Sequence, residues 1–352
     1  MKKRLFLLLF IWTAFNTVVF AQTRGEGHAI ILQYHRFGES RYPSTNINMD
    51  LFKKQMAYLH NNHYNVVPLS QVVKALMHKK PLPPKAVVIT MDDAYRTVYT
   101  NAYPILKKYN FPATIFVNSM PIIHHSKRYM TWAEMREMGR EGLAEFGNHT
   151  YSHEYLVRID SDKPAQYKKD VTKEILKCET KLQKELGKYL CSKPKMLAYP
   201  FGEFDVRLMK IIKKLGYVGI AQNSGPVSQR SNLLALTRFP MSGNFGKMQS
   251  FILKLHTLPL AVRSTSTEDT MVTKKNNPPI FRLKLEKKYK DLQCFTSNGQ
   301  KIDMKWLSDT EVQMQSKVLL QYPRDHYTCT AWAARGKWYW FSHMWVIAKE
   351  VK

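Results

Sequence analysis

Short apolar runs alternate with longer amphipathic stretches from His28 to about Pro240. Continuous apolar runs are typical of strands that are buried on both faces. Seven such runs lie at residues 29–34, 65–67, 86–91, 113–117, 143–146, 196–199 and 217–221. Helical spacing is found at residues 51–60, 70–77, 131–138, 166–186 and 204–215, and in a stretch ending at Tyr109. Repeated strand–helix units predict an α/β fold, an incomplete (β/α) barrel whose functional residues lie at the C-terminal ends of the strands.

The pattern changes at about residue 265. Residues 265–279 are polar, and residues 281–285 then alternate strictly between apolar and polar, as a half-exposed strand does. We therefore predict a first domain over residues 22–264 and a small C-terminal β-domain over residues 265–352, a candidate for glycan binding. Five of the seven tryptophans fall in the second domain. We expect most of them in its core, and the alternative is that exposed rings stack on sugars.

The first 21 residues have the pattern of a secretory signal peptide. Residues 2–4 are positively charged, residues 5–20 are mostly apolar, and small residues precede a cleavage site after Ala21. This pattern predicts a periplasmic or secreted protein. The alternative is an uncleaved membrane anchor, for which the apolar stretch is short.

Export to an oxidising compartment makes disulfides an expectation for the four cysteines. Pairing within each domain would join Cys178 to Cys191 and Cys294 to Cys329. The alternative is four free, buried thiols.

The chain is strongly basic, with a formal net charge of +27. Three positive charges belong to the signal peptide, which leaves 27 − 3 = +24 on the mature chain. The basic residues are spread along the sequence, and no nucleic-acid-binding motif accompanies them. We expect an anionic envelope surface as a partner, and no nucleic acid.

Three short polar motifs follow predicted strands. Asp92 and Asp93 end the third apolar run, and a Tyr-Pro-Phe-Gly sequence occupies residues 199–202. Between them lie His149 and His153, whose i, i+4 spacing predicts that both rings project from one face of a helical turn and hold one metal ion. Each motif alone is weak evidence for a site.

Together and in this order, the motifs resemble those of the NodB-type polysaccharide deacetylases, carbohydrate esterase family four. The resemblance covers roughly residues 28–240. It implies that Asp92 is the general base and that Asp93, His149 and His153 bind the metal. It also implies that the backbone N–H of Phe201 stabilises the oxyanion, an interaction usually worth several kcal/mol.

The chain departs from the commonest pattern of that family in four places, one of which is the absence of the family's separate Asp-Trp motif. The first motif has Ala94 where Gly is usual. A Tyr-His pair at the end of the first strand resembles the subgroup that deacetylates poly-N-acetylglucosamine, which implies His35 as the general acid in preference to His256. The Arg that usually precedes the Pro-aromatic motif is missing, and Arg238 is our candidate to orient Asp92 because it lies at the next strand end.

The resemblance implies metal-dependent removal of N-acetyl groups from an N-acetylglucosamine-containing polysaccharide, with release of acetate. An Asp-His-His set suits Zn²⁺, and Co²⁺, Ni²⁺ or Fe²⁺ would also fit. The alternatives are an O-acetyl esterase on the same fold and an envelope glycan-binding protein with little activity. A non-haem iron oxygenase is disfavoured, because Asp93 precedes His149 by 149 − 93 = 56 residues and the predicted fold is not a jelly roll.

Overall fold

A computed structural model describes residues 27–159, 163–191, 193–334 and 336–349. The predicted signal peptide lies outside these residues. Within the described part of the chain, no helix has the length and apolar character needed to cross a membrane.

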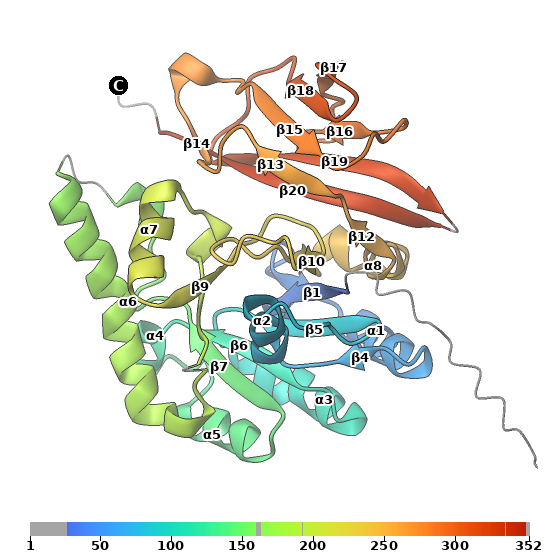
Figure 1. Ribbon diagram of the computed structural model, residues 1–352. Coiled ribbons are helices and arrows are strands. Elements are labelled where there is room, and N and C mark those ends of the chain that lie inside the picture. The colour runs from blue at the N-terminus through green and yellow to red at the C-terminus, as the bar shows by residue number, and fades with distance from the viewer. Residues whose placement is uncertain (1–26, 160–162, 192, 335, 350–352) are drawn as a thin grey trace, which may run out of the picture.

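A curled, mostly parallel sheet forms the N-terminal domain (Figure 1). Its strands run in the order β10 (Val227–Ser228), β1 (His28–Tyr34), β5 (Ala86–Met91), β6 (Ala113–Val117), β7 (Ala144–Asn148), β8 (Lys195–Ala198) and β9 (Tyr217–Ile220). Two short strands, β4 (Asn65–Val66) and β11 (Phe239–Pro240), pair with β5 and β1. Every residue of β5 is buried, as its continuous apolar sequence predicted. The incomplete (β/α) barrel expected from the sequence is confirmed.

Helices pack on both faces of this sheet (Figure 1). They are α1 (Met49–Asn61), α2 (Leu69–Met77), α3 (Tyr103–Tyr109), α4 (Met120–Ile123), α5 (Trp132–Arg140), α6 (Pro164–Leu186), α7 (Val206–Lys214) and α8 (Met248–Leu255). The apolar side chains of α2 pack with Ile31 and Val88 on one face, whereas those of α1, α3, α5 and α6 pack against the other face. The N-terminus of α5 shows how the sequence fixes a helix end. The Thr131 hydroxyl accepts the backbone N–H of Glu134, and the Glu134 carboxylate accepts the backbone N–H of Thr131.

Two smaller sheets form the C-terminal domain. One contains β12 (Thr257–Pro259), β20 (Lys337–Ile347), β19 (Arg324–Ala334), β16 (Gln293–Phe295) and β14 (Met271–Val272). The other contains β13 (Val262–Thr265), β15 (Phe281–Leu285), β18 (Glu311–Gln315) and β17 (Asp303–Trp306). In β15 buried and exposed residues alternate, as predicted. Because β12 and β13 pair with β20 and β15, the C-terminal sheets begin before the boundary drawn at residue 265.

The tryptophans of this domain divide between core and surface. Trp345 is buried, and Trp306 packs against the same core. Trp340 packs edge-on against Phe239 of the N-terminal domain. Trp332 and Trp338 are opposite each other on β19 and β20 and are exposed.

One of the two expected disulfides is present. Cys294 and Cys329 are bonded across the paired strands β16 and β19. The predicted Cys178–Cys191 bond is wrong, because both residues are free thiols. Cys178 projects from α6 into the hydrophobic cluster on one face of the large sheet, whereas Cys191 packs against the cluster on the other face.

Candidate active site

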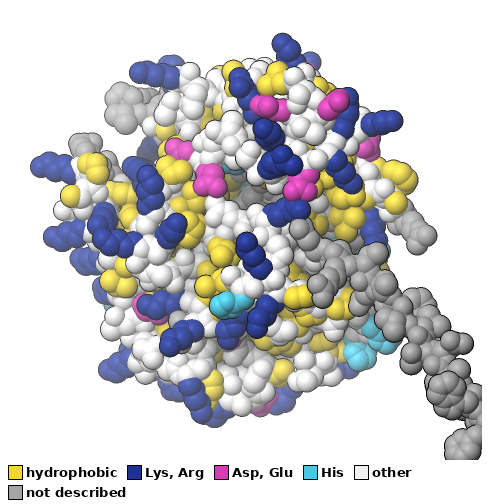
Figure 2. Space-filling view, viewed as in Figure 1, with side chains coloured by type: hydrophobic (Ala, Val, Ile, Leu, Met, Phe, Trp, Pro, Cys, Tyr) yellow, Lys and Arg dark blue, Asp and Glu magenta, His cyan; other side chains and the backbone are white. Residues whose placement is uncertain are grey.

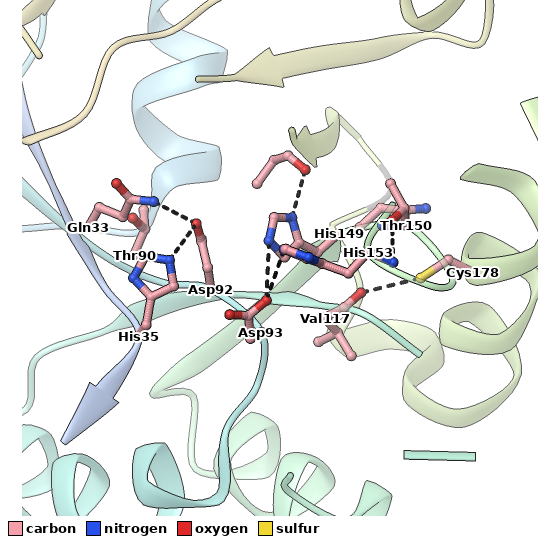
Figure 3. Close-up of polar contacts among 12 residues, drawn as sticks. Gln33, His35, Thr90, Asp92, Asp93, Val117, His149, Thr150, His153 and Cys178 are labelled. Atoms are coloured by element: carbon pink, nitrogen blue, oxygen red, sulfur yellow. Dashed lines mark hydrogen bonds and ion pairs between the residues drawn. The ribbon is translucent and has the colours of Figure 1, made fainter. Parts of the chain in front are cut away.

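The three predicted metal ligands meet at the C-terminal ends of β5 and β7 (Figure 3). Oδ1 of Asp93 lies 3.5 Å from Nε2 of His149 and 3.3 Å from Nε2 of His153. One ligand atom from each residue lies within 4.8 Å of the other two. This spacing suits three ligands that converge on a single ion.

The polar atoms of this cluster fit a bound cation. Oδ1 of Asp93 and Nε2 of His149 are buried and have no hydrogen-bond partner within the described residues, which is uncommon for buried polar atoms. Nδ1 of His149 lies 2.7 Å from the carbonyl oxygen of Ala198; with a proton on Nδ1, the lone pair of Nε2 is free. Burial, and then the neighbouring His153, lower the pKa of His149 to about 4, so the ring is neutral at pH 7. Neutral imidazole and carboxylate are donors that divalent transition metals bind.

The histidine pair lies on a loop, and the predicted helical turn is wrong. Thr150 and His153 have φ values of 66° and 65°, in the left-handed region that non-glycine residues rarely adopt. Asn148 accepts the backbone N–H of Thr150, and the Thr150 hydroxyl accepts the backbone N–H of His153. These side-chain bonds fold the loop back, so the two rings lie 4.7 Å apart without a helix.

Asp92 is fully buried beside the predicted metal ligands and is held by two side chains. Arg238 donates to Oδ1 at 2.7 Å and to Oδ2 at 2.9 Å, so the structure places the predicted orienting residue against this carboxylate. Gln33 also donates to Oδ2, at 2.8 Å. Burial opposes ionisation of Asp92, but the charge of Arg238 and its hydrogen bonds outweigh it. The pKa of Asp92 therefore lies well below its ordinary value, and the side chain is a carboxylate.

His35 lies on the same side of Asp92 as Gln33 (Figure 3). Its Nε2 atom is 3.8 Å from Oδ2 of Asp92, and its side chain is partly exposed. Burial, and then the nearby charges of Lys337 and Lys85, lower the pKa of His256, the other candidate for the acid. Since Lys85 precedes β5, His256 lies at the opposite end of that strand from Asp92.

Phe201 lies in η4 (Pro200–Gly202), a short 3₁₀ turn after β8, and has a left-handed φ of 58°. Its ring stacks on Tyr155, with ring centres 3.6 Å apart, and meets the ring of His153 edge-on. The Tyr-Pro-Phe-Gly motif is thereby packed directly against the histidine loop. Strained backbone of this kind persists where packing holds it, and it is concentrated at functional sites.

Three contributors to the site were missed by sequence reasoning. Gln33 could have been found, because it is two residues before His35 and strand residues i and i+2 share a face. Tyr95 directly follows the first motif. Burial, and then the nearby charge of Asp93, raise the pKa of Tyr95, and the guanidinium carbon of Arg36 lies 3.4 Å from the centre of its ring. Tyr155 carried no signal in the sequence.

Similarity to known proteins agrees with this geometry. Residues 79–220 match the family model described as polysaccharide deacetylase. The chain carries a NodB-type polysaccharide deacetylase domain. A poly-beta-1,6-N-acetyl-D-glucosamine N-deacetylase of Staphylococcus aureus is 28% identical over 237 residues, which are 62% of this chain and 80% of the relative.

Solved structures of other deacetylases share the fold of this domain. The deacetylase PplD of Streptococcus pyogenes, solved in complex with acetate, is 26% identical with a TM-score of 0.57. The match covers 66% of this chain and 99% of PplD. IcaB from Ammonifex degensii is 25% identical with a TM-score of 0.53, covering 63% of this chain and 94% of IcaB.

Proposed function

We propose that this deacetylase hydrolyses N-acetyl groups of an N-acetylglucosamine polymer and releases acetate. The observation that carries the proposal is the convergence of Asp92, His35 and the Asp93–His149–His153 cluster at one end of the barrel. The substrate class is supported by the relative from Staphylococcus aureus, which is named for poly-beta-1,6-N-acetyl-D-glucosamine.

Asp93, His149 and His153 would hold the divalent metal, with zinc as the proposed ion. Such an ion, when bound, polarises the acetyl carbonyl and lowers the pKa of a water molecule towards about 7. The unpartnered Oδ1 of Asp93 and Nε2 of His149 support this assignment.

The remaining groups move protons and bind the developing charge. Asp92, fixed by Arg238 and Gln33, takes a proton from the water that attacks the carbonyl carbon. The backbone N–H of Phe201 donates to the oxygen on which negative charge develops. His35 gives a proton to the sugar nitrogen as the carbon–nitrogen bond breaks. The products are acetate and a free amine on the sugar.

The proposed location is the periplasm or the cell exterior, after removal of the signal peptide. The net charge of the mature chain, +24, supports an anionic envelope surface as the environment of the protein. Figure 2 shows Lys and Arg side chains over the whole visible face, with few Asp and Glu among them.

Acetate release from N-acetylglucosamine oligomers tests the function and the acid assignment together. His35→Ala should lower kcat by roughly a hundredfold, since general acid catalysis contributes about that much. His256→Ala is the matched control and should keep the wild-type rate. An acetate ester should be cleaved by His35→Ala almost normally, because an alkoxide leaves more readily than an amine. Full amide hydrolysis by His35→Ala would remove His35 from the mechanism, and ester cleavage alone by the wild type would favour an O-acetyl esterase.

A further inference from the structure

A buried charge network joins the Phe201 turn to the C-terminal domain. Glu203 follows Gly202 directly, and its side chain has no solvent exposure. Oε1 of Glu203 accepts a 3.1 Å hydrogen bond from Nη1 of Arg324, the first residue of β19. Arg158 donates two further hydrogen bonds to this carboxylate. Its Nη2 lies 3.1 Å from Oε1, and its Nε lies 2.7 Å from Oε2. One carboxylate therefore binds an arginine from each domain.

Arg158 connects this network to the histidine loop and to the C-terminal domain. It closes the 3₁₀ turn η2 (Leu156–Arg158), which follows the histidine loop and begins one residue after Tyr155. Its guanidinium also donates to the carbonyl oxygens of Pro323 and Ile347, at 2.7 and 3.0 Å. The segment that carries Tyr155, the stacking partner of Phe201, is thus also anchored to the C-terminal domain.

Further contacts hold the residues that follow Glu203. The hydroxyl of Thr270 donates to the carbonyl oxygen of Phe204. The carboxylate of Asp269 accepts the backbone N–H of Val206 at 3.4 Å. Figure 1 shows the ends of β14 and β20 next to α7, which begins in this segment. Residues 203–206 therefore contact the second domain at three points.

We propose that the C-terminal domain is part of the catalytic unit, with Arg324 as a positioning residue for the Phe201 backbone N–H. Phe201 has a left-handed φ value of 58°, which non-glycine residues rarely adopt, so the orientation of its peptide must be imposed by its surroundings. Gly202 follows with a φ of 74°, which glycine adopts without strain. Glu203 is the first residue after Phe201 whose side chain is anchored to the second domain, and Arg324 provides that anchor. The proposal rests on the proposed function, because the N–H matters only if an oxyanion forms.

Kinetics of N-acetylglucosamine oligomer hydrolysis by the full chain tests this role. Arg324→Ala should lower kcat by roughly ten- to hundredfold with little change in KM, since small displacements of a reacting group have effects of this size. Arg324→Lys, which keeps the charge, should restore part of kcat. The matched control is Arg282→Ala, an exposed arginine of β15 whose side chain hydrogen-bonds only to Gln313 among the described residues. Wild-type kcat in Arg324→Ala would overturn the proposal.

Hydrogen–deuterium exchange of the same proteins gives a readout that needs no activity. Amides of residues 199–205 should exchange at least about tenfold faster in Arg324→Ala than in wild type or Arg282→Ala, while β5 and β6 keep their protection. Unchanged exchange in 199–205 would refute the positioning role even if the enzyme proved inactive on every glycan. Acetate release by the wild type is scored separately, so failure of the proposed function is distinguishable from failure of this inference.

Discussion

At the scale of single residues, the contact between Asp92 and Arg238 organises the site. Both side chains are fully buried, and two hydrogen bonds join them. Arg238 also donates to the carbonyl oxygen of Ala221 and to the hydroxyl of Thr90. The pair is therefore held rigidly, and it presents Asp92 as a carboxylate next to the proposed metal ligands. A buried ion pair of this kind is valuable for orientation and costly to break.

Loss of Arg238 should destabilise the protein more than loss of the pair. Arg238→Met leaves an uncompensated buried carboxylate and should lower the free energy of unfolding by about 3–5 kcal/mol. The double variant Asp92→Asn/Arg238→Met should be more stable than Arg238→Met alone, because the unpaired charge is gone. Urea unfolding of both single variants, the double variant and the wild type at pH 7 measures the coupling. Additive effects of the two substitutions would show that the pair is not energetically coupled.

The sequence predicts the functional residues of this site better than it predicts the neighbouring residues that hold them in place. Asp92, Asp93, His35 and Arg238 are at or near strand ends, and the parallel sheet brings strand ends together. Tyr155 could not be predicted, because its contact with Phe201 depends on how two loops fold over each other.

At the scale of elements, two predictions made from the positions of residues in the sequence are wrong. The i, i+4 histidines suggested a helical turn, but side-chain bonds from Asn148 and Thr150 compete with helix formation here. The Cys178–Cys191 pairing followed from pairing the cysteines within each domain, but the two thiols pack against opposite faces of the sheet. By contrast, strict alternation in β15 and continuous burial in β5 are periodic signals, and both strands form as predicted.

Strand β20 carries a buried histidine that should make stability depend on pH. His343 lies between the rings of Phe281 and Trp345, and burial lowers its pKa to about 4. Its folded pKa lies below the ordinary value of about 6.5, so the neutral form is favoured. Its stabilising contribution is therefore complete above pH 6.5 and is lost as the pH falls towards 4.

Replacement of this histidine isolates the effect. The fall in Tm between pH 7.5 and pH 5 should be smaller in His343→Phe than in wild type, because the phenyl ring has no proton to gain. Thermal unfolding followed by circular dichroism at both pH values measures the difference. An equal fall in the two proteins would show that folding does not lower the pKa of His343.

At the scale of the whole molecule, the two domains share a packed interface. Met344 and Val346 of β20 belong to a hydrophobic cluster that includes Leu208 and Ile212 of α7. Trp340 packs on Phe239, and its indole N–H donates to the hydroxyl of Ser224. Figure 1 shows the β19–β20 hairpin lying across the N-terminal domain. Apolar contact on this scale predicts that the domains unfold together.

Calorimetry tests this cooperativity. The wild type should unfold in one transition, whereas Trp340→Ala should lose about 3 kcal/mol of stability and bring the transitions of the two domains apart. Trp332→Ala, an exposed residue of the same hairpin, should leave the profile unchanged. Two separate transitions in the wild type would show that the domains are energetically independent.

The central claim is that Asp93, His149 and His153 hold the metal on which deacetylation depends. The most direct measurement is acetate release from N-acetylglucosamine oligomers, with bound metal determined on the same samples. Chelation should abolish release, and added Zn²⁺ should restore it. Asp93→Ala and His149→Ala should lose both bound metal and activity. Release at the wild-type rate in chelator, or in both variants, would contradict the account.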